Sequence, residues 1–438
     1  MYKIKYFLLS GLATLLAGCV SSATVPVFAD LGILDRVWVD AAGNYYSVVQ
    51  ASNGELTIHE PASGSFYNYT REQLLAPISR RPSHAPKIDR VNGKLLFGDK
   101  TLSLANVEMR EIRFGNAGTD LYGILAIPDS EQPVPVVIDS HGSERSSAVE
   151  YGWSPAWYAE AGFATFIFDK RGTGRSGGEY TQDFDLLATD LQAAVSVVAA
   201  EPGIDPTLIG VGGYSQGVFV STLAASREPA ISFLIASFGV IESPLREDFL
   251  ETRLHFEANY PELSWGEFEP LVLACEQAFA LRQNEKWSEV SHLKRKWHDR
   301  IDADDLYGTM TGDGCLRWSP LVLRLLGRSQ FPRGLDWSHD PKPLVEELEI
   351  PMIWQYGLAD EDAPPETSIS LLEEWIEQGK PIDLHTYADA EHGMYHTMIN
   401  SSGESYRYKD PEYIRHLIDW LIEQRLTQET AGRALSTR

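Results

Sequence analysis

The chain has 438 residues, with 37 lysines and arginines against 62 aspartates and glutamates, so its formal net charge is −25. This excess of negative charge argues against nucleic acid, anionic lipid headgroups or anionic polymers as the main partner. The length and a hydrophobic content of 43% allow one large domain with accessory parts.

The first residues are predicted to direct export rather than to belong to the fold. Lys3 and Lys5 form a basic start, residues 6–16 are an apolar run too short to span a bilayer, and small residues precede Cys19. The pattern resembles a bacterial lipoprotein signal, which implies removal of residues 1–18 and lipidation of Cys19. An ordinary secretory peptide with an incidental cysteine is the alternative. The resemblance implies an envelope protein held by its lipid, in the outer membrane and facing the periplasm.

Residues 19–105 form the next segment, rich in Gly, Asn, Ser and Pro, with short alternating runs such as ELTIHE and GKLLFG. The pair Asn92-Gly93 lies between two such runs and predicts a tight hairpin. We therefore expect a small β-rich unit, to which the sequence assigns no function.

From residue 106 onward, short apolar runs alternate with helical patterns, which is typical of strands buried on both faces of a parallel sheet. The alternation covers 106–242, stops, and resumes over 347–438. The fold class is therefore predicted to be α/β, a mostly parallel doubly wound sheet. The expected strands are 134–139, 163–168, 208–212, 231–237, 351–356 and 381–387.

Residues 243–346 interrupt the alternation with helical patterns and are predicted to be an inserted helical cap. The five tryptophans of the cap fit either an apolar substrate pocket or packing within the cap itself. Cys275 and Cys315 lie in this segment, and an oxidising compartment would let them pair; two separate buried thiols are the alternative. No spacing of His, Cys or Asp matches a metal site, and no cofactor is predicted.

The stretch Gly213-Tyr214-Ser215-Gln216-Gly217 follows an expected strand and precedes an expected helix. A Gly-x-Ser-x-Gly pattern alone is weak, but strand, sharp turn and helix are the setting of a nucleophile elbow. We therefore predict that Ser215 is a catalytic nucleophile. Because a helix amino terminus directs N–H groups toward developing negative charge, the amide of Gln216 is the first candidate for an oxyanion hole.

A serine nucleophile needs a base, and the base needs an acid that orients it. At this point the chain resembles the α/β-hydrolase superfamily, whose order is nucleophile, acid, histidine. The loop YGLADEDAPPE is similar to the family's acid loop and implies that Asp360 is the acid, with Asp362 as the alternative. The loop ADAEHGMYH is similar to the family's histidine loop and implies that His392 is the base, with His396 as the alternative.

Two further segments carry the resemblance. The loop DSHGSERSS resembles the family's His-Gly oxyanion motif, which implies the amide of Ser143 as second donor; a plain strand-end turn is the alternative. The segment FDKRGTGRSGGEY resembles the family's Asp-x-Arg-Gly stretch, in which Asp169 and Arg171 have structural roles. Within the superfamily, the chain is most similar to the serine aminopeptidase-like and dienelactone hydrolase-like branches.

The resemblance covers about 107–242 and 347–425, a little over half of the chain. It implies a serine hydrolase acting on a small-molecule ester through an acyl-enzyme. A peptidase that uses the same triad on short peptides is the second hypothesis, because esters and amides need the same three residues. A binding protein that keeps the fold without catalysis is the third, and the joint presence of Ser215, Asp360 and His392 argues against it.

Overall fold

The computed structural model describes residues 36–50, 54–70, 72, 74, 86–152, 154–283, 286–303, 321, 334–399, 403 and 405–436. The expected signal segment 1–18, Cys19 and Cys315 lie outside the described residues. Within these ranges no helix is long and apolar enough to cross a membrane. Nor does this part of the chain contain a group of three or more His, Cys, Asp or Glu side chains that could hold a metal ion.

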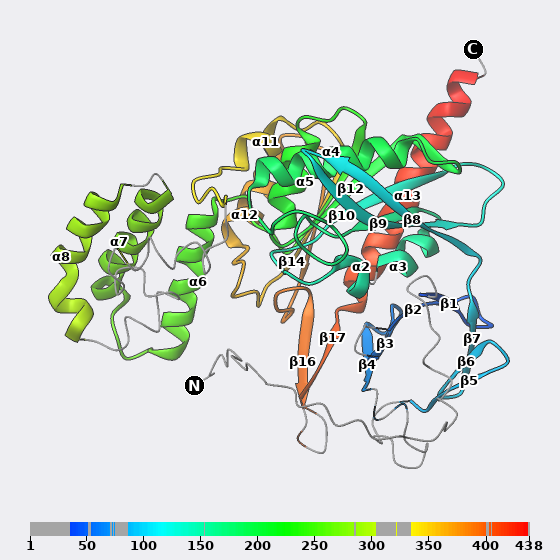
Figure 1. Ribbon diagram of the computed structural model, residues 1–438, viewed down its shortest axis with the longest axis horizontal. Coiled ribbons are helices and arrows are strands. Elements are labelled where there is room, and N and C mark those ends of the chain that lie inside the picture. Colours follow the sequence, from blue (N-terminus) through cyan, green and yellow to red (C-terminus); the bar gives the residue numbers. More distant parts are fainter. Residues whose placement is uncertain are drawn as a thin grey trace, which may run out of the picture.

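The centre of the molecule is an eight-stranded sheet in the order β15-β14-β13-β12-β10-β11-β9-β8 (Figure 1). Six neighbouring strands, β11, β10, β12, β13, β14 and β15, run parallel to one another. At one edge, β8 and β9 form an antiparallel hairpin, and β9 pairs antiparallel with β11. The strands are β8 (Val107–Asn116), β9 (Thr119–Pro128), β10 (Val134–Ser140), β11 (Ala164–Phe168), β12 (Ile204–Tyr214), β13 (Ile231–Ser237), β14 (Met352–Gly357) and β15 (Ile382–Tyr387).

Helices cover both faces of this sheet, so the predicted doubly wound α/β fold is confirmed. On β10, Val136 and Ile138 join the larger apolar core, while Val137 between them joins the core of the opposite face. The larger core includes α4 (Phe184–Ala199), α5 (Gly217–Ala225), α11 (Lys342–Glu347) and α12 (Glu366–Glu377). The opposite core includes α3 (Ser154–Ala161) and α13 (Pro411–Ser436), and the short α2 (Ala148–Tyr151) precedes α3.

A second sheet of nine strands contains the amino-terminal β-rich segment, in the order β16-β17-β4-β3-β2-β1-β7-β6-β5. All neighbouring strands of this sheet pair antiparallel. Asn92 and Gly93 form the turn between β5 and β6, with φ of 52° and 78°. Its first seven strands are β1 (Val37–Val39), β2 (Tyr45–Gln50), β3 (Leu56–Glu60), β4 (Ser65–Tyr69), β5 (Ile88–Val91), β6 (Lys94–Phe97) and β7 (Lys100–Leu104).

The last two strands of this sheet come from the other end of the chain. The hairpin β16 (Tyr395–Ile399) and β17 (Ser405–Lys409) pairs with β4 through Tyr408 and Ser65, and the amide of Lys409 donates to the carbonyl of Gly64 at 2.8 Å. The sequence analysis assigned all of 347–438 to the α/β core, whereas the structure gives this hairpin to the amino-terminal sheet. The two sheets are therefore joined immediately after the loop that carries His392.

The inserted segment contains α6 (Pro244–Asn259), α7 (Trp265–Gln283) and α8 (Trp287–Ala303), and α7 and α8 lie well away from the sheet (Figure 1). These helices pack on each other around Leu271 and Cys275, with Trp297 against the same cluster. Trp265 packs against Phe256 with ring centroids 5.5 Å apart. Cys275 is disulfide-bonded. These tryptophans therefore contribute to packing within the cap.

Candidate active site

Ser215 lies at the sharp turn between β12 and α5. Its φ is 53°, in the left-handed region that side chains other than glycine rarely adopt. A Cβ at Gly213 would overlap the Ser221 hydroxyl, and one at Gly217 would overlap the carbonyl of Ser140. Only glycine fits on either side of the serine, so the sequence forces the turn that exposes Ser215.

The carboxyl ends of β12, β14 and β15 bring the predicted triad together. His392 follows β15, and its Nε2 is 3.1 Å from Ser215 Oγ. Its Nδ1 is 2.9 Å from Oδ2 of Asp360, which follows β14. The ring of Phe238, after β13, meets the His392 ring edge-on at 5.2 Å between centroids. The spacing of nucleophile, base and acid fits proton transfer from Ser215 to an oriented imidazole.

The surroundings of Asp360 hold it as a hydrogen-bond acceptor. Its side chain is 1% exposed, and its Oδ1 accepts the amides of Asp362 at 3.0 Å and Ala363 at 2.8 Å. Burial lowers the pKa of His392, but the hydrogen bond and the charge of Asp360 outweigh this and raise the pKa above its ordinary value. An imidazolium formed during reaction is therefore stabilised in place.

The two alternatives from the sequence lie elsewhere. Asp362 is exposed, lines the cavity beside His392 and gives its amide to Asp360. His396 is on β16, and its Nε2 is 2.8 Å from Asp410 Oδ2. Neither has a hydrogen bond to Ser215 or His392 within the described part of the chain.

The two candidate oxyanion donors are available. Within the described ranges, neither the amide of Gln216 nor that of Ser143 donates to another group of the chain. The ammonium of Lys170 donates to the carbonyl of Gly142, and Tyr180 Oη donates to the carbonyl of Ser143 at 2.6 Å. The carbonyl of Gly142 and the N–H of Ser143 belong to the same trans peptide unit and point in opposite directions. The hydrogen bond from Lys170 to this carbonyl therefore fixes the direction of the Ser143 N–H.

Lys170 was missed by the sequence analysis, although it lies in the quoted segment FDKRGTGRSGGEY. Its side chain is buried, and burial lowers its pKa to about 8 against the raising effect of Glu144. Asp169 and Arg171, which the sequence analysis expected to have structural roles, bind neighbouring segments. Asp169 Oδ1 accepts the Val149 amide at 3.0 Å, and Arg171 Nε donates to Asp190 at 2.7 Å.

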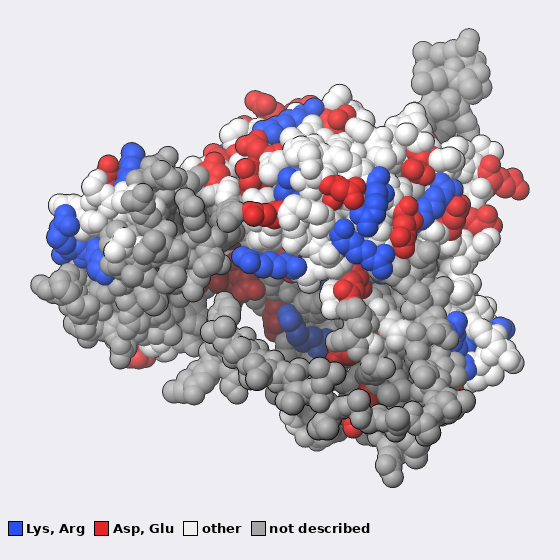
Figure 2. Space-filling model, in the orientation of Figure 1, with Lys and Arg blue, Asp and Glu red and all other residues white. Residues whose placement is uncertain are grey.

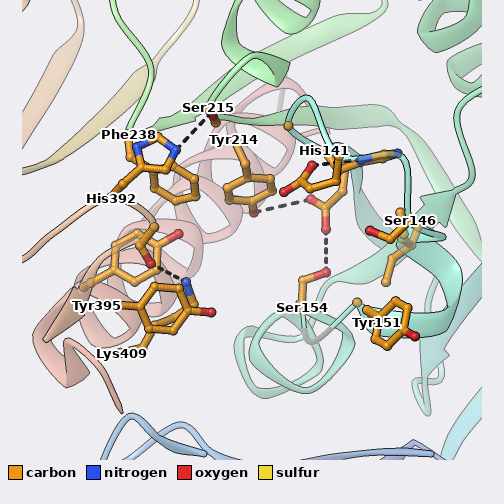
Figure 3. A pocket seen from close by; sticks show the side chains of 18 of the residues that line it. His141, Ser146, Tyr151, Ser154, Tyr214, Ser215, Phe238, His392, Tyr395 and Lys409 are labelled. Atoms are coloured by element: carbon orange, nitrogen blue, oxygen red, sulfur yellow. Dashed lines mark hydrogen bonds and ion pairs between the residues drawn. The ribbon is translucent and has the colours of Figure 1, made fainter. Parts of the chain in front are cut away.

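Ser215 and His392 open into a cavity of about 420 Å³ (Figure 3). One side of the view holds His141, Ser146, Tyr151 and Ser154, and the other holds Tyr395 and Lys409. The lining residues come from the α/β core, α2, α3 and the hairpin β16–β17, and none of them belongs to the described part of the cap. Within the described part of the chain, the hairpin β16–β17 thus completes the pocket.

Asp139 is a second buried carboxyl in the cavity, at the end of β10 just before His141. It accepts hydrogen bonds from Ser154 Oγ, from Tyr158 Oη at 3.2 Å and from Tyr214 Oη at 3.4 Å. Burial raises its pKa to about 7, which these hydroxyls oppose. Its position at a strand end is the signal by which the sequence could have identified it.

The charges on the surface are mixed. Figure 2 shows acidic and basic side chains interspersed over the visible face of the α/β part, rather than one basic surface.

Comparison with known proteins gives relatives of several activities. A polyketide transferase of Stachybotrys chlorohalonatus is 30% identical over 24% of this chain and 35% of its own length. A thiohydrolase of Aspergillus aculeatus is 27% identical over 30% of this chain and 42% of its own length. The chain thus spans less than half the length of each of these curated relatives.

Solved structures of similar shape include two esterases. The Pyrococcus furiosus esterase has a TM-score of 0.41 at 17% identity, over 66% of this chain and 83% of its own. An acetyl xylan esterase of Thermoanaerobacterium has a TM-score of 0.38 at 17% identity, over 71% of this chain and 84% of its own. The family model of the X-Pro dipeptidyl-peptidases matches residues 117–387. This match covers more than half of the chain, which therefore belongs to the X-Pro dipeptidyl-peptidase (S15) family and is a serine hydrolase of the α/β-hydrolase fold.

Proposed function

We propose that the chain hydrolyses small carboxylic esters with Ser215, His392 and Asp360 as its triad. The observation that carries this proposal is the continuous line of hydrogen bonds from Ser215 Oγ through the imidazole to Asp360, at 3.1 and 2.9 Å, open to a cavity of about 420 Å³.

In the proposed reaction, His392 Nε2 takes the Ser215 proton while Oγ attacks the ester carbonyl. The amides of Gln216 and Ser143 stabilise the resulting oxyanion. When the intermediate collapses, the imidazolium gives its proton to the leaving alcohol and an acyl-enzyme remains. A water activated by His392 then releases the acid and restores Ser215.

An ester is preferred to a peptide because of the charges in the cavity. A peptidase that removes dipeptides must hold a free ammonium at the substrate's amino end, which calls for a carboxylate that is not already engaged. Of the carboxylates that line the cavity, Asp139 accepts from three hydroxyls, Glu144 is 3.4 Å from His141, and Asp362 is exposed to solvent, where an ion pair contributes little. Lys409 and Arg407 line the same cavity and would repel an ammonium.

The test is hydrolysis of p-nitrophenyl esters from acetate to laurate by the purified chain, with Ser215→Ala and His392→Ala in parallel. We expect turnover that falls by about 10³-fold or more in both variants, since each removes a member of the triad. Turnover that survives in Ser215→Ala would exclude the proposed nucleophile. The chain-length optimum measures the size of the acyl site.

The family match favours a second candidate, cleavage of short peptides after proline by the same triad. An alanyl-prolyl p-nitroanilide assayed beside the esters separates the two. A kcat/KM for the anilide above that of every ester would replace ester hydrolysis with peptide hydrolysis as the main activity.

We also propose that the protein is an exported lipoprotein anchored through Cys19, in the outer membrane and facing the periplasm. The support is the basic, apolar and small-residue order of residues 1–19. Labelling cells with a palmitate analogue should mark the wild-type chain and leave Cys19→Ala unmarked. Label on the variant would point to another site of acylation.

A further inference from the structure

Lys409 is a buried lysine whose side chain reaches the active-site cavity. It is the last residue of β17, and its side chain is part of the cavity lining although the residue is only 6% exposed. Its Nζ donates to the carbonyl of Gly393 at 2.5 Å. The ring centroid of Tyr395 lies 4.3 Å from Nζ, and the ring centroids of Phe238 and Tyr413 lie 5.6 Å away.

No carboxylate compensates this charge. Among the residues that the structure describes, no carboxylate oxygen lies within 4.0 Å of Lys409 Nζ. An ammonium has three N–H donors, and in this part of the chain the Gly393 carbonyl takes one. Burial, with the nearby Arg407 charge, lowers the pKa of Lys409 to about 7. The aromatic faces offset only part of such a cost, so the site lacks an anion.

Lys409 is close to the reacting groups. Gly393, which accepts its hydrogen bond, directly follows His392, and the Phe238 ring contacts both the imidazole and the ammonium. Figure 3 shows His392, Tyr395 and Lys409 on the same side of the cavity. Because His392 must protonate the leaving group, the leaving half of an ester lies on this side.

The other charged groups leave this corner open to an anion. Arg407 lines the cavity near the Tyr395 ring, with a distant 3.5 Å contact to Glu391. Of the carboxylates in the lining, Asp139 and Glu144 are already hydrogen-bonded. The third, Asp362, is exposed and belongs to the Asp360 loop rather than to the hairpin.

We propose that Lys409, assisted by Arg407, is a binding subsite for a carboxylate on the leaving alcohol of the substrate. The natural substrate class is then a small ester whose alcohol half is a hydroxycarboxylate. This inference rests on the proposed ester hydrolysis. It gives the hairpin β16–β17 a role in specificity that neither the triad nor the family match assigns.

The test compares 4-acetoxybenzoate with its methyl ester, which differ in one carboxylate on the leaving group. Wild type should prefer the charged ester in kcat/KM. Lys409→Met should lower the ratio of charged to neutral rates by about ten- to a hundredfold, the range expected for a hydrogen bond to a charged group. Arg407→Gln, on a side chain that is 53% exposed, should lower the same ratio by a smaller factor and serves as a second variant should Lys409→Met fold poorly.

The matched control is Arg415→Gln, which removes one exposed cation of α13 outside this cavity and should keep the wild-type ratio. A ratio that is equal in wild type, Lys409→Met and Arg407→Gln overturns the subsite. The monosuccinate ester of phenol carries its carboxylate on the acyl half, and a Lys409-dependent preference confined to that ester overturns the assignment to the leaving group. Absence of turnover with both neutral and charged esters is the separate failure of ester hydrolysis itself.

Discussion

The turn that carries Ser215 and the hairpin that carries Lys409 line one cavity, but different parts of the sequence determine their positions. The turn depends on a local sequence pattern, because any side chain at position 213 or 217 would overlap neighbouring atoms. The hairpin depends on pairing with β4, at the opposite end of the chain. The turn of the nucleophile is therefore determined locally, whereas the cavity wall that carries Lys409 depends on a contact between distant segments. Changes that disturb one side of the cavity and spare the other test this distinction.

The largest effect is expected from the acid of the triad. Asp360→Asn removes the acceptor that fixes the His392 tautomer and should lower kcat/KM for p-nitrophenyl acetate by about 10³- to 10⁴-fold. Asp362→Asn is the matched change two residues away and should cost less than about tenfold, because Asp360 alone contacts Nδ1. The measurement is steady-state kcat/KM for both variants. A larger loss of kcat/KM in Asp362→Asn than in Asp360→Asn would make Asp362 the acid of the triad.

The next effect concerns the loop that carries the second oxyanion donor. Lys170→Met releases the Gly142 carbonyl and with it the direction of the Ser143 amide. We expect kcat to fall by about 10- to 100-fold with KM within about threefold, since the oxyanion forms only in the transition state. Lys170→Arg, which can still donate, should recover part of kcat. A change confined to KM would contradict a role in oxyanion positioning.

A change at the junction of the two sheets should affect preference more than chemistry. Gly64 has a φ of 67°, and a Cβ there would overlap the carbonyl of Lys409. Gly64→Ala should lower the free energy of unfolding by about 1–3 kcal/mol and reduce the charged-to-neutral ester ratio severalfold. Gly43, in the turn between β1 and β2, has a φ of 90° and open space around it. Gly43→Ala therefore introduces backbone strain in the same sheet without a steric overlap and is the control. Equal charged-to-neutral ester ratios in Gly64→Ala and Gly43→Ala would contradict a role of the hairpin in specificity.

The smallest expected effect is a shift in pH dependence. His392 must be neutral to accept a proton and its pKa is raised, so kcat/KM for a neutral ester should rise with pH through a limb above the ordinary histidine value of about 6.5. The charge of Lys409 lowers the pKa of His392. Lys409→Met should therefore move the limb to higher pH, measured as kcat/KM between about pH 5 and pH 9. A limb that moves downward would contradict this electrostatic coupling.

Much of the α/β part was predictable because its signals are local. The expected strand 231–237 coincides with β13, and 134–139 differs from β10 by one residue. Strand 208–212 proved to be the middle of the longer β12, which begins at Ile204, pairs there with Val134 of β10 and resumes pairing at Ile209 after a register shift. The resemblance of the loops around Ser215, Asp360 and His392 to the α/β-hydrolase motifs was enough to anticipate that the three residues meet.

The far wall of the cavity was not predictable in the same way. Residues 395–399 and 405–409 are mostly exposed or half-buried, so these two strands lack the continuous apolar run by which the strands of the central sheet were recognised. Their pairing with β4 involves two segments at opposite ends of the chain, and no periodicity within either segment encodes it. Lys409 consequently looked like any surface lysine, and the sequence analysis named the cap tryptophans, but not this hairpin, as candidates to line a pocket.

The pairing of Ser65 with Tyr408 also bears on how the protein is made. A growing chain contains Ser215 about 190 residues before β17 (Ser405–Lys409), which is the last described strand and directly precedes α13. The amino-terminal sheet must therefore wait for the synthesis of β17 before its strand order is complete, and closing so long a loop is slow. Until then the cavity beside Ser215 lacks one wall, so a nascent or truncated chain contains the serine before the cavity is complete.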